Sequence, residues 1–183
     1  MVVSAHEVAA ELRDRLPGLG AKKQHKLLYY CQGHHLATFG EPLFAETISA
    51  WDMGPVVGAL WHQEKAGDVP GAVSSMTEAQ LNTIGYVVSR YGGLSGSDLQ
   101  RLTHSELPWQ QANAGRTQGT SARIPVDSLR EYFASANDDE SDETIPLPDA
   151  QAVATWLSEV PPKPPTEIHV DSLDDLRARF TRA

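Results

Sequence analysis

Cys31 and His35 have the types and the spacing that nucleophilic chemistry requires. Side chains four residues apart lie on one face of a helix, so the imidazole could take the proton of the thiol. A nucleophile also needs an oriented base and a site for the oxyanion, and nothing near this pair in the sequence indicates either. A small buried thiol beside a packed histidine is the simpler interpretation. We therefore expect a protein that is not an enzyme.

The remaining residues that carry chemistry are not spaced for a metal or a cofactor. His34 and His35 are adjacent, so they face different sides of a helix, and no cysteine or second histidine recurs at three or four residues with a partner elsewhere in the chain. The glycine-rich stretch 92–96 lacks the lysine and the preceding strand of a phosphate-binding loop. We expect no metal ion and no cofactor.

The net charge of −9 is concentrated near the C-terminus. Residues 1–136 contain 13 acidic and 11 basic residues, whereas residues 137–183 contain 11 acidic and 4 basic residues. Nucleic-acid binding depends on Lys and Arg that neutralise phosphates, so we do not expect a nucleic-acid partner. The one basic cluster is explained more simply as a solvated helix start than as a phosphate contact. It consists of Lys22, Lys23, His25 and Lys26.

The sequence indicates a cytoplasmic protein without membrane spans. No stretch approaches the ~20 apolar residues that a membrane helix requires. The first residues lack the basic and apolar regions of an export signal. Cys31 is the single cysteine and cannot form an internal disulfide, which agrees with a reducing compartment.

Helix-start and helix-stop signals recur along the chain and predict a mainly α fold. Ser4 and Glu7 have the spacing of a capping box, and apolar residues follow with a helical period. We expect helices over 4–16, 21–38, 77–91, 95–102 and 126–133, and one that begins at Gly54-Pro55 with proline in its first turn. Residues 47–51 and 122–124 resemble short strands. The expected fold is a compact multi-helix domain with one small two-stranded β pairing at most.

The composition changes after Ala136, which predicts a domain over 1–136 and an acidic, proline-containing extension over 137–183. Residues 137–143 have the composition of a solvated linker, and the prolines at 161–165 require an extended chain between two short amphipathic helices. The apolar residues of these helices are candidate partner-binding residues, because such side chains are seldom left in water. They are Trp156, Leu157, Leu173, Leu176 and Phe180. The extension is either a solvent-facing linker or an arm that clamps a basic partner.

Two blocks of sequence carry a resemblance to a known family. The first is 26–36, continued by 40–44 and 50–56, and the second is 102–109. The residues that match the family pattern are Lys26, Leu27, Tyr29, Gln32, Trp51, Gly54, Pro55, Thr103, His104, Pro108 and Trp109. In order and spacing they resemble the Panacea, or SocA-like, antitoxin family over about residues 21–133. The chain departs from the family pattern at Gln24, His25 and His34.

The resemblance implies an antitoxin of a type II toxin–antitoxin system, a kind often carried by phages and mobile elements. Such a protein neutralises a cognate toxin, encoded by a neighbouring gene, by direct protein–protein binding. The alternative that the resemblance implies is a proteolytic adaptor, which delivers the toxin to a Clp-type protease.

The residues that match the family have either structural or partner-binding roles. Trp51 is expected to pack back on the helix that follows Gly54-Pro55. Thr103 and His104 fall at the end of a predicted helix, where a histidine can bind free carbonyls and favour the negative end of the dipole. Pro108-Trp109 is expected to turn the chain and anchor it with a large ring.

Overall fold

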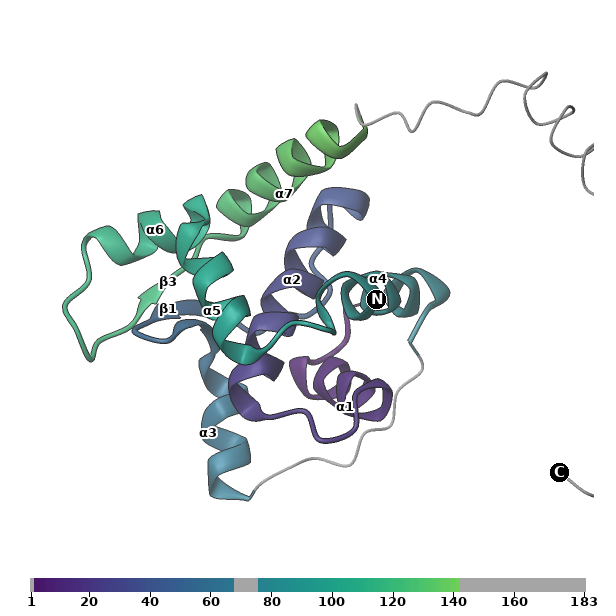
Figure 1. The fold of residues 1–183 in the computed structure, drawn as a ribbon, viewed down its shortest axis with the longest axis horizontal. Coiled ribbons are helices and arrows are strands. Elements are labelled where there is room, and N and C mark those ends of the chain that lie inside the picture. Colours follow the sequence, from purple (N-terminus) through teal and green to yellow (C-terminus); the bar gives the residue numbers. More distant parts are fainter. Residues whose placement is uncertain (1, 68–75, 142–183) are drawn as a thin grey trace, which may run out of the picture. The chain divides into compact units, whose positions relative to one another are not determined.

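Six helices surround one central helix in the computed structural model, which describes residues 2–67 and 76–141 (Figure 1). The helices are α1 (Ala5–Arg15), α2 (Ala21–Phe39), α3 (Gly58–Ala66), α4 (Glu78–Tyr91), α5 (Gly96–Ser105), α6 (Leu107–Ala114) and α7 (Val126–Ser141). The strands are β1 (Ile48–Trp51), β2 (Gly54–Val57) and β3 (Ala122–Arg123). The expected mainly α fold with a small β pairing is confirmed.

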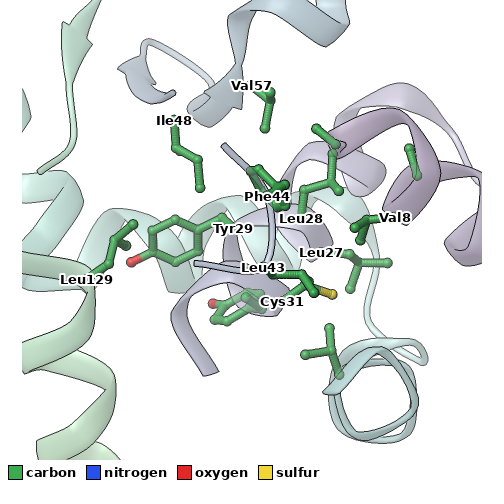
Figure 2. Packing of buried hydrophobic residues seen from close by; sticks show 14 of the residues in the cluster. Val8, Leu27, Leu28, Tyr29, Cys31, Leu43, Phe44, Ile48, Val57 and Leu129 are labelled. Atoms are coloured by element: carbon green, nitrogen blue, oxygen red, sulfur yellow. The ribbon is translucent and has the colours of Figure 1, made fainter. Parts of the chain in front are cut away.

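The central helix α2 is buried along most of its length. Every residue from Gln24 to Leu36 is buried, and α2 contacts α1, α4, α5, α7 and β2. Figure 2 shows Leu27 and Leu28 of α2 packed among side chains from other elements, including Val8. A helix that is buried on every side has no solvated face, so its polar side chains need partners inside the protein.

Side-chain caps define where three of the outer helices, α1, α4 and α5, begin. Ser4 caps α1 in a capping box with Glu7, as predicted. Thr77 and Ser95 cap α4 and α5 in the same way. These caps satisfy backbone N–H groups that have no partner within the helix, so the local sequence is enough to define each start.

The prediction that Gly54-Pro55 begins a helix is wrong. Gly54 to Val57 form β2, and α3 begins at Gly58. The sheet therefore has three antiparallel strands in the order β2-β1-β3, one more than expected. Proline tolerates both settings, because its missing N–H does no harm at a helix start or on the free edge of a strand. Here Pro55 lies on the free edge of β2.

Two further elements differ from the expectations. Pro108-Trp109 lies in a helix of its own, α6, with proline in the first turn. α7 continues to Ser141, past Ala136, where we expected the helical domain to end. The division into a domain over 1–136 and an extension over 137–183 stays a prediction. The candidate partner-binding residues of the extension lie outside the described residues: Trp156, Leu157, Leu173, Leu176 and Phe180.

Neither a membrane-spanning helix nor a metal cluster occurs in the described part of the chain. Within residues 2–67 and 76–141, no helix has the length and apolar character to cross a bilayer. In the same residues, no three His, Cys, Asp or Glu side chains are grouped so that they could hold a metal ion.

The close packing of α2 against α7 generates a stability prediction. A Cβ atom added at Gly33 of α2 would lie 2.2 Å from Cε2 of Phe133, a buried ring of α7. We expect Gly33→Ala to lower the free energy of unfolding by about 1–3 kcal/mol, because the crowded ring cannot move freely. Gly85→Ala is the matched control: its Cβ would meet only the end of the Arg15 side chain, at 3.0 Å. This control should be neutral or stabilising by up to about 1 kcal/mol through helix propensity. Urea unfolding measures both, and equal effects would contradict the packing argument.

Candidate functional site

The side chains of α2 complete the free edge of β2. Lys26 is 1% exposed, and its Nζ donates to the Pro55 carbonyl over 3.0 Å. The Val57 N–H donates to Nδ1 of His25 over 3.4 Å. Because Pro55 has no N–H, its only backbone group that needs a partner is the carbonyl. A lysine is long enough to reach that carbonyl from a helix, so α2 takes the place of a further strand.

Gly54 is required where Lys26 crosses the turn between β1 and β2. Its φ of +99° is one that side chains rarely adopt. A Cβ atom there would lie 2.6 Å from Cε of Lys26 and 3.1 Å from Oγ1 of Thr103. Thr103 is fully buried, and its hydroxyl donates to the Leu99 carbonyl over 2.9 Å. Three parts of the family pattern, distant in sequence, therefore meet at one point.

Burial around Lys26 controls the charges of this cluster. It lowers the pKa of Lys26 to about 7, helped by repulsion from Lys22. Burial, with repulsion from Lys26, also lowers the pKa of His25 to about 4, so His25 is neutral at pH 7 and can accept from Val57. The interpretation of the basic cluster as a solvated helix start is therefore wrong for Lys26 and His25, because both are buried.

His104 and Trp109 stabilise the turn between β1 and β2 from the side of α5 and α6. The two rings stack with centroids 3.8 Å apart, and Nε1 of Trp109 donates to the Trp51 carbonyl over 3.3 Å. Pro108 and Trp109 both lie in the first turn of α6. His104 does lie near the end of α5, as expected, but burial followed by repulsion from Lys26 lowers its pKa. It acts here as an aromatic ring rather than as a cation at the helix end.

The other α2 residues of the family pattern are also buried. Oε1 of Gln32 accepts from the N–H groups of Leu43 (3.0 Å) and Phe44 (3.1 Å), and its Nε2 donates to the Phe44 carbonyl over 3.0 Å. Leu27 belongs to the core, and the ring of Tyr29 meets that of Phe133 edge-on at 5.5 Å. Together with Lys26, these side chains are inaccessible to a partner while the domain is folded.

Cys31 and His35 are directed to separate surroundings. Cys31 is fully buried in the core, as Figure 2 shows, and burial raises the pKa of its thiol. Nδ1 of His35 forms a hydrogen bond with Oγ1 of Thr83 on α4, at 2.9 Å. Burial lowers the pKa of His35. A protonated thiol in a dry environment is a poor nucleophile.

A pocket lies at the β1–β2 turn. We call it the turn pocket; its volume is about 580 Å³, and it is lined by Trp51, Asp52, Met53, Gly119, Thr120 and Ser121. Trp51 is half-buried and meets Trp61 of α3 edge-on at 5.3 Å, as expected for a ring that packs back on the next helix. Met53 is 54% exposed.

An ion pair connects the two walls of the turn pocket. Asp52 pairs with Arg116 over 2.5 Å and accepts from the Gly119 N–H over 2.9 Å. Arg116 also donates to the Thr120 carbonyl over 2.6 Å. Asp52, Met53 and Arg116 are not among the predicted site residues, because no local pattern relates residues 52–53 to residue 116.

The buried amine of Lys26 generates a pH prediction. The ordinary lysine value is 10.5, and the folded state lowers this pKa to about 7. Between these values the unfolded chain binds the proton and the folded chain does not, so the contribution of Lys26 to stability rises with pH. We expect the unfolding free energy of wild type minus that of Lys26→Met to rise between pH 7 and pH 9, by at most about 1.4 kcal/mol per pH unit. Denaturant unfolding at several pH values measures it.

Lys65→Met provides the control for that measurement. Lys65 is exposed on α3 and contacts the Trp61 ring, so this substitution removes a lysine without opening a buried site. A difference for Lys26→Met that does not rise with pH would show that the amine is not buried in the way described.

Comparison with known proteins identifies the family. Residues 25–110 match the family model described as "Antitoxin SocA-like, Panacea domain". No curated protein and no solved structure matches the chain. The match spans every residue of the family pattern, from Lys26 to Trp109, and confirms the resemblance over a narrower range than the expected 21–133. Residues 25–110 of this chain are therefore similar to the SocA-like Panacea domain of antitoxins.

Proposed function

We propose that the chain is the antitoxin of a toxin–antitoxin system and that it neutralises a cognate protein toxin by direct binding in the cytosol. The match of residues 25–110 to the SocA-like antitoxin domain carries this proposal. The description of the family gives the class of activity, and the exposed surface of the domain is the part that would contact the toxin.

The distribution of the family-pattern residues supports binding rather than catalysis. Lys26, Gly54, Thr103 and Trp109 are buried and hold the β1–β2 turn, so they act as a framework. A framework of this kind presents surfaces such as the turn pocket without reorganisation, and a preformed surface loses less entropy when a partner binds. The buried, protonated thiol of Cys31 agrees with a protein that performs no bond-making chemistry of its own.

The charge distribution favours a protein partner over a nucleic acid. The net charge is −9, and nucleic-acid affinity needs exposed basic residues. Two basic side chains are turned inward: Lys26 binds a backbone carbonyl and Arg116, 6% exposed, pairs with Asp52. Neither is available for a phosphate group.

Co-expression with the neighbouring gene tests the proposed function. If that gene encodes the toxin, its induction alone should stop growth, and co-expression of this chain should restore growth by forming a complex that copurifies. The same assay in a strain without the Clp protease separates the two modes of action. A direct blocker restores growth in both strains, whereas a proteolytic adaptor fails in the strain without the protease. A neighbouring gene that is harmless, or equally lethal beside this chain, would contradict the proposal.

A further inference from the structure

A groove between α6 and α7 differs in charge from the turn pocket. The groove holds about 190 Å³ and is lined by Leu107, Gln111, Ser128, Glu131, Tyr132 and Ser135. This is below the roughly 300–1,000 Å³ of a typical small-molecule site, so it suits one long side chain. A hydrogen bond of 3.1 Å between Ser128 Oγ and Gln111 Oε1 bridges the two helices.

The groove combines an apolar rim with uncompensated negative charge. Leu107 is 55% exposed, and Tyr132 is half-buried beside it in the lining. Glu131 is exposed and forms no ion pair with a cation in the described part of the chain. The arginine of the same helix, Arg130, pairs instead with Asp127. No lysine or arginine lines the groove.

A second carboxylate lies at the N-terminal end of α6. Glu106, which immediately precedes α6, is 9% exposed and accepts from the hydroxyl of Tyr30 over 2.8 Å. Burial raises the pKa of Glu106 to about 7, and the nearby hydroxyls of Tyr29 and Tyr30 oppose this rise. No cation among the described residues contributes to that balance. Glu106 adds to the effect of burial in raising the pKa of Tyr132, which lines the groove.

We propose that the α6–α7 groove accepts a lysine or arginine side chain that projects from the toxin, an inference that rests on the proposed function. The aliphatic stem packs against Leu107 and the ring of Tyr132, and the cationic head faces Glu131. Charge complementarity favours this occupant, because an acidic or purely apolar side chain would leave Glu131 without compensation. The turn pocket offers no such preference, because Arg116 already pairs with its carboxylate.

The first test uses the complete chain and a small probe in place of the toxin. N-acetylarginine amide is titrated to millimolar concentration while backbone amide shifts are followed by NMR, and N-acetylcitrulline amide serves as the neutral control of the same shape. Saturable shifts confined to α6 and α7, seen with the arginine probe and lost in Glu131→Arg, support the proposal. The absence of saturable shifts, or equal shifts with the citrulline probe or in Glu131→Arg, overturns it.

The second test measures the affinity of the toxin for matched variants by calorimetry. Glu131→Arg should weaken binding by about tenfold or more, and Leu107→Ser should also weaken it. Asp14→Arg, an equal charge change at an exposed residue of α1, and Leu102→Ser, at another exposed leucine, should leave affinity within about twofold. Equal effects of Glu131→Arg and Asp14→Arg would overturn the groove and leave the antitoxin function intact. A wild-type chain that does not bind the toxin would instead overturn the antitoxin function, and the arginine titration would still decide the groove.

Discussion

The hydrogen bond from Lys26 to the Pro55 carbonyl is the interaction on which the arrangement of the domain depends. A three-stranded sheet this small leaves an edge strand facing the core, and its unpaired backbone groups cannot be buried without partners. A further strand would normally supply those partners. Here α2 supplies them, with a lysine for the carbonyl and a neutral histidine for the Val57 N–H. The helix can therefore pack directly against the strand while the Pro55 carbonyl and the Val57 N–H both have partners.

The position of the Lys26 side chain restricts which residues can lie around it. Gly54 has to be a glycine because the stem of Lys26 passes where its side chain would lie. Thr103 fills the remaining space and satisfies its own hydroxyl within α5. Trp109 then fixes the turn from the other side through the Trp51 carbonyl. The spacing of the family pattern thus follows from one cluster that draws on α2, the β1–β2 turn, α5 and α6.

The separation between a buried framework and an exposed surface is consistent with a binding protein. The framework residues are inaccessible, so the residues that distinguish one partner from another must lie outside them, on surfaces such as the turn pocket and the α6–α7 groove. These surfaces include the exposed apolar residues Met53 and Leu107. Exposed apolar side chains on a preformed surface are typical of sites where proteins associate.

The sequence alone determined the features that depend on neighbours along the chain. The capping box of Ser4 and the helical periodicity are local, and the family pattern could be recognised from residue order, so the helices and the antitoxin family were predictable. Only the tertiary structure decided the environment of each residue. Lys26 looks like a solvated cation and Gly54-Pro55 looks like a helix start until β2 and α2 are placed side by side. Burial and hydrogen-bond partners come from residues distant in sequence, and local propensity does not contain that information.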